Sequence, residues 1–415
     1  MKLLKLELKR VLKTRLTWIL LLCSLFFTFF MAYMPTTFGR ISYTSETGET
    51  IKLKGLDYIK YKKEVQKDTA GTVTSEKLRQ ALEVFQDCLN EYGKSSIYEL
   101  HEDVYNERIL PYAPLWRCIR EAYANPDTGM AANIKDIAPQ QIDNFYSACL
   151  DRIDSLMKME QKNHPAAQNH AITMYGKVEM PFTFYPGYTT EAMDYQTLFI
   201  FLIVLFSVVI TAPIFSSDYQ SGADDIIRCT KNGRLRLGIT KIVSAFIICM
   251  SSFVLCNILY IIISNSLFGW ECTKISMQML YSVVSLPSFN LGEMQFFIIV
   301  ASLISMLATI SLTLFISSKF KTNFASLSMG ILFFFLPTVV YASIPGKIGT
   351  WLLCILPSSG ASIQSAWQFV LTDFEYLNIG NIAVWTPYAM IGFTVIELIV
   401  FTGLTLYSYC AHKIK

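Results

Sequence analysis

The sequence is poor in charge and lacks the motifs of several function classes. Only 16% of its 415 residues are Asp, Glu, Lys or Arg, whereas an ordinary soluble domain has about 25%. It contains no GxxxxGK[ST] loop, so the chain is not expected to bind ATP through that motif. Its ten cysteines show no metal-ligand spacing and its four histidines are scattered. We therefore expect no catalytic, metal or cofactor site in this chain.

What the sequence has instead is a set of long uncharged stretches. The first could be a signal peptide, because basic residues precede it, but its apolar run is too long and no small-residue cleavage pattern follows it. Each of the six stretches is long enough for a transmembrane helix, and they cover residues 16–34, 195–215, 242–268, 295–317, 323–344 and 387–409. The predicted fold class is an α-helical polytopic membrane protein with six transmembrane helices.

The basic residues indicate how these helices are oriented. Residues 1–15 contain six Lys or Arg and the 216–241 loop contains five, whereas loops 269–294 and 345–386 contain one each. Cytoplasmic loops of membrane proteins carry the excess of Lys and Arg. The distribution predicts that both termini and the 216–241 loop are cytoplasmic.

Residues 37–194 have the composition of a soluble domain. They hold 18 of the 35 Lys and Arg residues and 23 of the 32 Asp and Glu residues, and a segment of this length is an ordinary domain size. We predict a large, mostly helical α+β extracellular domain inserted between helices 1 and 2, with a hairpin around Gly48 and a strand within 171–188. Whether its three cysteines form a disulfide is left open by the sequence; they are Cys88, Cys118 and Cys149.

The 216–241 loop carries the signals of a helix. Ser217 and Gln220 fit a capping box, Asp218 suits the positive end of the helix dipole, and Asn232–Gly233 is a typical stop. The pattern predicts one helix over 217–232, with an Asp224–Arg228 pair and an apolar face of Tyr219, Ala223, Ile226, Ile227 and Thr230.

Two functions of this helix are possible. A membrane-surface helix would place its basic residues against anionic lipid. A docking helix for a soluble partner explains its three acidic residues better, because an anionic membrane would repel them.

The same segment resembles one found in a known family. Its pattern is similar to the segment after the second span in ABC-2-type transporter permeases of Gram-positive bacteria, and the residues that carry the resemblance are Asp218, Gly222, Asp225, Ile226, Ile227, Arg228, Thr230, Gly233, Arg234 and Lys241. In that family the segment is the coupling helix that contacts the ATPase subunit. The resemblance implies an ATPase-coupling site at Ser217, Asp218, Tyr219, Gly222, Asp225, Ile226, Ile227, Arg228, Gly233 and Arg234. The alternative for Arg234 is that it does no more than mark the boundary of the next span.

Two further segments agree with this resemblance. Residues 1–15 form a basic amphipathic pattern with Leu4, Leu8, Val11 and Leu12 on one stripe, as expected of a cytoplasmic interfacial helix. Residues 345–386 look like the outer re-entrant segment of the family. A looser similarity to some clostridial-type permeases begins at residue 52.

The resemblance implies a permease subunit in the bacterial cell membrane. Its expected partners are an ABC ATPase subunit that binds ATP and Mg, a second permease subunit and the lipid bilayer, with no nucleic acid. Export of a peptide, toxin or amphipathic drug fits the large outer domain. The alternative is a mechanotransmission protein whose outer domain is moved without cargo crossing; a membrane enzyme would need catalytic residues in the spans, which hold almost none.

Two features inside the predicted spans could be functional. Glu397 is the only acidic or basic side chain in the spans so defined; it could bind a cationic part of the cargo, pair with a polar group of another span, or be a protonated acid that donates to a backbone carbonyl. Ala301, Ser305 and Thr309 are small residues four apart, which permit close helix packing, although small residues are common in spans anyway.

Overall fold

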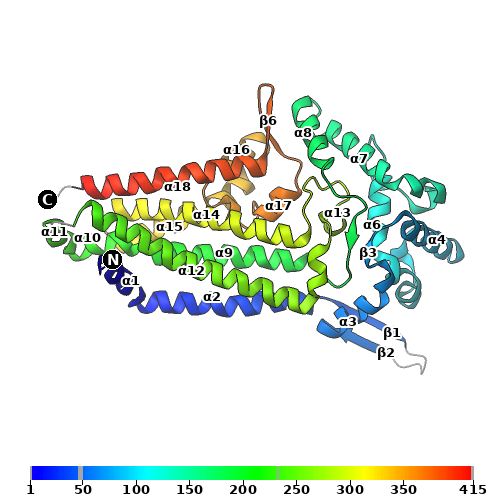
Figure 1. Ribbon diagram of the computed structural model, residues 1–415, viewed down its shortest axis with the longest axis horizontal. Helices are drawn as coiled ribbons and strands as arrows, with labels where there is room; N and C mark the ends of the chain where they lie inside the picture. The colour runs from blue at the N-terminus through cyan, green and yellow to red at the C-terminus, as the bar shows by residue number, and fades with distance from the viewer. Residues whose placement is uncertain (1, 45–49, 231–232, 413–415) are drawn as a thin grey trace.

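The computed structural model describes residues 2–44, 50–230 and 233–412. Six helices in this part of the chain are long and apolar enough to cross a membrane. They lie side by side along the long axis of the molecule (Figure 1). These helices are α2 (Arg15–Tyr33), α9 (Glu191–Thr211), α12 (Leu235–Phe268), α14 (Leu291–Lys319), α15 (Asn323–Ser343) and α18 (Thr386–Ala411).

The six-helix prediction is therefore confirmed, but several helices are longer than their uncharged stretches. The helix α12 begins at Leu235 rather than at 242. Consequently Lys241 lies inside α12, and α9 and α14 also begin before the predicted spans. Glu397 is thus not the only charged residue in the spanning helices.

The centre of the bundle is formed by α9 and α14. In the most apolar stretch of each, 67% of the residues are buried, whereas the share is 22–33% in the other four. The outer helices expose rows of large apolar side chains, among them Phe26 and Phe30 on α2 and Ile399 on α18. Such exposed apolar surface is expected where lipid or another membrane helix covers the protein.

Both termini lie at one end of the bundle, and the insert between α2 and α9 lies at the other (Figure 1). The short helix α1 (Lys2–Leu12) packs its apolar stripe against the bundle, where Val11 joins Ile210 and Ile248 in a small cluster. After α9 the chain continues into α10 (Pro213–Ser221) and α11 (Ala223–Arg228) at this same end.

The insert is helical with two small antiparallel sheets. Its core includes Leu78, Leu82, Phe85 and Leu89, which are fully buried on the predicted face of α4. The helices are α3 (Gly55–Val65), α4 (Ser75–Glu91), α5 (Glu102–Val104), α6 (Ala113–Ala122), α7 (Phe145–Glu160) and α8 (Pro165–Tyr175); strands β1 (Arg40–Thr44) and β2 (Thr50–Lys54) pair, as do β3 (Gly71–Thr72) and β4 (Thr183–Phe184).

Three expectations about the insert can be compared with this structure. The hairpin is present, but its turn around Gly48 lies outside the described residues. The strand predicted within 171–188 is wrong for most of its length, because 171–175 belong to α8 and only Thr183–Phe184 pairs. Cys88, Cys118 and Cys149 are buried free thiols, so no disulfide links them.

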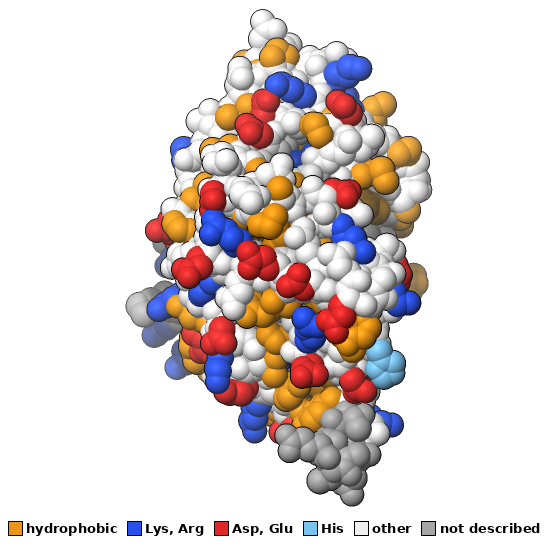
Figure 2. Space-filling model, turned by 90° about the vertical axis from the view of Figure 1, so that its right-hand side faces the viewer, with side chains coloured by type: hydrophobic (Ala, Val, Ile, Leu, Met, Phe, Trp, Pro, Cys, Tyr) orange, Lys and Arg blue, Asp and Glu red, His pale blue; other side chains and the backbone are white. Residues whose placement is uncertain are grey.

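The insert is held to the bundle through the α12–α14 connection, which contains α13 (Met277–Leu280). Arg117 Nη2 donates to the Met279 carbonyl at 2.9 Å, and a Glu121 carboxylate oxygen accepts from the Val283 amide at 3.1 Å. On its outward face, acidic and basic side chains are interspersed (Figure 2), as is typical of a surface in water.

The α15–α18 connection forms a second structure at the insert end of the bundle. Its Gly360 lies against Ser305 of α14, so the segment packs on the buried centre of the bundle. It contains α16 (Lys347–Ile355), a 3₁₀ turn (Ser359–Ala361), α17 (Trp367–Thr372) and the antiparallel strands β5 (Tyr376–Ile379) and β6 (Ile382–Trp385).

Candidate coupling site

The polar segment after α9 is not the single helix that its sequence predicts. Gly222 adopts a left-handed conformation with φ 70° and separates α10 from α11. Ser217 is therefore an interior residue of α10 and not an N-cap. Gln220 does not complete a capping box; its side-chain oxygen accepts the Asn323 amide at 3.0 Å. Glycine suits this break because it has no Cβ to clash at positive φ.

Asp218 also has a different role from the one expected. It lies in the last turn of α10 and is only 6% exposed. Its carboxylate contacts Arg10 Nη1 at 2.7 Å and Lys241 Nζ at 2.7 Å. Because these two cations enclose it, Asp218 is not available to a docking partner.

Four charged side chains from three helices form this ionic network, and all of them except Arg10 are buried. Glu7 and Arg10 come from α1, Asp218 from α10 and Lys241 from α12. Glu7 lies 3.0 Å from Arg10 and 3.5 Å from Lys241, and the Lys241 side chain is fully buried. Charges in such surroundings require partners and hydrogen bonds, and the Ile214 carbonyl accepts from Arg10 at 3.0 Å. The network fixes α10 to α1 and α12.

The sequence patterns alone do not predict this network. The sequence places Lys241 at the end of the expected 216–241 loop, and it predicts only an interfacial helix for residues 1–15. One signal was present: Glu7 is the only acidic residue among the first 15, and an acid within a basic amphipathic helix indicates a cationic partner.

Further contacts attach α10 to the rest of the same end. Ser216 Oγ donates to the Asn323 side-chain oxygen of α15 at 2.8 Å, and the Phe215 amide donates to Ser317 Oγ of α14 at 3.1 Å. The Tyr219 ring stacks on His412 with ring centroids 4.6 Å apart. Helix α10 is thus bonded to α14 and α15 and stacks on the residue that follows α18.

In contrast, α11 projects from this anchored base. Ile226 is 76% exposed and Asp225 is exposed beside it. Gly222 is exposed and Gly233 is buried, where its carbonyl accepts from Tyr409 Oη at 3.0 Å. Arg234 is exposed at the N-cap of α12. The predicted stop at Asn232 and the side chain of Arg228 lie outside the described part of the structure.

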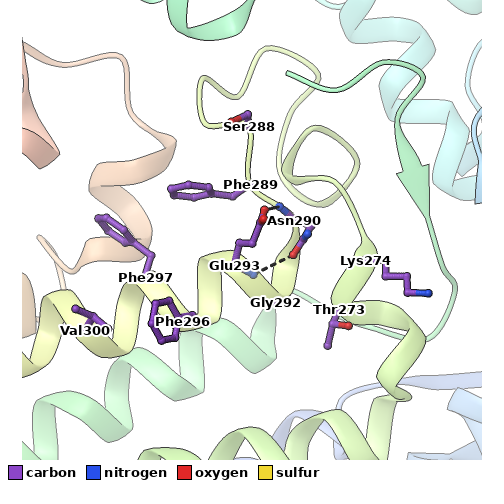
Figure 3. Close-up of a pocket in the computed structure, with 10 residues that line it drawn as sticks. All are labelled: Thr273, Lys274, Ser288, Phe289, Asn290, Gly292, Glu293, Phe296, Phe297 and Val300. Carbon is purple, nitrogen blue, oxygen red and sulfur yellow. Dashed lines mark hydrogen bonds between the residues drawn. The ribbon is translucent and has the colours of Figure 1, made fainter. Parts of the chain in front are cut away.

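A second feature is a cleft of about 680 Å³ at the N-terminal end of α14, on the insert side (Figure 3). One side is apolar, with Phe296, Phe297 and Val300 on α14. The other is polar, and there Asn290 and Glu293 cap α14 reciprocally at 2.9 Å. The Glu293 carboxylate therefore caps the first turn of α14. Lys274 is the other charged side chain that lines the cleft.

Glu397 has no partner among the described residues. One of its carboxylate oxygens is buried without a hydrogen bond. Neither a backbone carbonyl nor a polar group of another span is bonded to it in the described part of the chain, so two of its three expected roles have no support within one subunit.

Ala301, Ser305 and Thr309 are all buried within this chain. Ser305 faces Gly360, where an added Cβ would lie 2.6 Å from Ser305 Oγ. One close approach at Ser305 is therefore made to the α15–α18 connection, and the packing of Ala301, Ser305 and Thr309 against another spanning helix stays a prediction.

These features define a polytopic membrane protein in which a short projecting helix is anchored between the helices at one end. The chain matches the model of the ABC-2 family transporter proteins over residues 1–413, and it belongs to that family. Comparison with curated proteins gave no match.

Proposed function

We propose that this chain is the permease subunit of an ABC transporter and that a separate ATPase subunit, which binds ATP and Mg, docks on α11. The carrying observation is the contrast between α10, which is fixed by buried contacts, and α11, whose Ile226 is 76% exposed. An exposed isoleucine beside the exposed Asp225 suits a groove on a soluble protein. Family membership supports the same assignment.

The network around Asp218 would transmit a conformational change of the ATPase to the membrane helices. A force on α11 reaches α10 through Gly222, and α10 is bonded to α1, α12, α14 and α15. Because α10 continues directly from α9, a displacement of α11 is transmitted to α9, one of the two central helices. We propose that this motion re-orients the spans.

We further propose that the protein lies in the bacterial cell membrane with both termini cytoplasmic, the insert outside, and a second permease subunit beside it. The exposed apolar rows of α2 and α18 are available to lipid or to that subunit. Export of a peptide, toxin or amphipathic drug remains the favoured direction of transport.

Mechanotransmission is the second candidate. It is supported by the rigid attachment of the insert, in which Glu121 and Arg117 bond to the α12–α14 connection and Lys63 pairs with Glu271 at 2.7 Å. ATP-dependent accumulation of cargo in proteoliposomes separates the two functions, since mechanotransmission predicts none.

The docking proposal is tested by replacing Ile226 and Ile227 with Asp and measuring co-purification with a P-loop ATPase encoded beside this chain. The apolar contact is lost and repulsion is added, so the complex should no longer form. The control is Tyr98→Asp, because Tyr98 is 75% exposed at the opposite end. A stable complex with the double variant would overturn the proposal.

A further inference from the structure

A cavity of about 460 Å³ lies at the insert end of the bundle, among the ends of α15 and α16, the α17–β5 connection and the start of α18. Part of its wall is apolar and is formed by Ile344, Leu353, Val370 and Met390. The rest is polar and includes Thr350, Gln364, Asp373 and Glu375. The cavity therefore places an apolar surface directly beside two carboxylates.

The two carboxylates are held in position by their backbone. Asp373 follows α17 in an extended conformation, and both Asp373 and Glu375 line the cavity. The Glu375 carbonyl accepts from Thr386 Oγ1 at 2.7 Å, and the Asp373 carbonyl accepts from Trp385 Nε1 at 3.4 Å. These bonds fix the segment to the start of α18 and leave both side chains facing the cavity.

Neither carboxylate has a protein partner in the described part of the chain. No Lys or Arg is among the residues that line the cavity. The cation that acts electrostatically on Glu375 is Lys347, and its Nζ lies 3.0 Å from His164 Nε2 of the insert. The lining of the cavity consequently has a net negative charge.

A further carboxyl group lies deeper along α18. Thr386 and Met390 line the cavity, and Glu397 lies seven residues beyond Met390 on the same face of α18. Its unpartnered carboxylate is about 10 Å further along the helix axis.

We propose that this cavity binds a cationic amphiphile, with the cationic group between Asp373 and Glu375 and the apolar body against Leu353, Val370 and Met390. This inference rests on the proposed transport function, since it names the chemical class of the cargo. A divalent metal ion is a poorer occupant: Ca²⁺ takes about 6–8 oxygen ligands, and no group of three or more potential metal-ligating residues occurs among the described residues.

The test uses the full chain in lipid nanodiscs and the probe tetraphenylphosphonium, an apolar cation. Binding is measured by equilibrium dialysis against empty nanodiscs. Asp373→Asn with Glu375→Gln removes both charges at almost constant size and should weaken binding by about tenfold or more. Thr350→Trp fills the cavity while keeping both carboxylates, and it should also weaken binding.

Two controls separate the cavity from general charge effects. Asp136→Asn with Glu179→Gln removes two exposed carboxylates of the insert and should leave binding unchanged. Tetraphenylborate has nearly the same shape and the opposite charge, so its binding should be weaker than that of the cation and should not fall in the Asp373→Asn, Glu375→Gln variant.

Unchanged tetraphenylphosphonium affinity in a folded charge-removal variant, or equal binding of the two probes, would overturn the proposal. If that variant does not fold, unchanged affinity in Thr350→Trp overturns it instead. The assay contains no ATPase, so a negative result leaves the docking of an ATPase on α11 intact.

Discussion

Lys241 Nζ lies 2.7 Å from a carboxylate oxygen of Asp218, and the Lys241 side chain is fully buried. This contact joins the helix that precedes the projecting α11 to a membrane-spanning helix. Arg10 of α1 contacts the same carboxylate at 2.7 Å. Two cations from two different helices, α1 and α12, therefore fix α10, from which α11 projects.

The first prediction concerns the stability of this network. Lys241→Met should destabilise the protein by about 3–5 kcal/mol, because removal of one partner leaves an uncompensated buried charge. Lys241→Met combined with Asp218→Leu should cost less, since the remaining Glu7–Arg10 pair is balanced. Thermal unfolding in detergent measures both.

Lys60→Met is the matched control. Lys60 pairs with Asp57 while both side chains are more than 70% exposed, so its loss should change stability by about 0.5 kcal/mol or less. Equal effects of Lys60→Met and Lys241→Met would show that the buried network does not stabilise the fold.

The second prediction concerns Glu397. An ionisable side chain at the centre of a span costs about 2.5–3.5 kcal/mol on insertion scales, and Glu397 has no partner among the described residues. Glu397→Leu should therefore raise the melting temperature of the isolated chain, and Glu397→Gln should raise it less. A fall in melting temperature with Leu would reveal a stabilising partner.

The third prediction compares two glycines. An added Cβ at Gly360 would lie 2.4 Å from Trp367 Nε1, so Gly360→Ala should destabilise by about 1–3 kcal/mol. Ser305→Leu should act in the same direction, because Ser305 is fully buried against Gly360. Gly392→Ala meets open space and, as a helix-interior change, should stabilise slightly. Similar melting temperatures for Gly360→Ala and Gly392→Ala would contradict this packing.

The fourth prediction is a pH dependence of probe binding. Burial raises the pKa of Asp373 to about 6, and the Glu375 carboxylate adds to the effect. Burial also raises the pKa of Glu375; Glu160 of α7 raises it further and Lys347 of α16 lowers it. His170 of α8 contacts the Tyr376 hydroxyl. A cation prefers the ionised acid, so tetraphenylphosphonium binding should be strongest above this pKa and decrease as the pH falls through about 6. A flat profile between pH 5 and 7.5 in dialysis would contradict this assignment.

The sequence was sufficient to predict the six helices, because uncharged stretches of that length have few other structures. The face of α4 was also predictable, since its apolar residues recur with helical spacing. The break at Gly222 was not, because a lone glycine is tolerated within a helical pattern. The break accompanies contacts such as Arg10–Asp218 and Gln220–Asn323, which join residues 208 and 103 positions apart.

The cavity was equally inaccessible to sequence reasoning. Its wall combines residues from 341 to 390 that no short motif connects. Asp373 and Glu375 look like ordinary loop acids until the segment is placed against α18. Of the residues expected to contact the ATPase, Ile226 and Asp225 on α11 are exposed, whereas Asp218 on α10 is buried. Their part in docking stays a prediction.

The measurement that tests the coupling account most directly uses Cys229, which follows α11 and is the only exposed cysteine of the ten. A membrane-impermeant maleimide should label it in inverted vesicles and not in intact cells, and Cys229→Ser should abolish the signal. Adding the ATPase subunit to the inverted vesicles should then protect Cys229 from labelling. Labelling at an unchanged rate in a complex that contains the ATPase would contradict docking on α11.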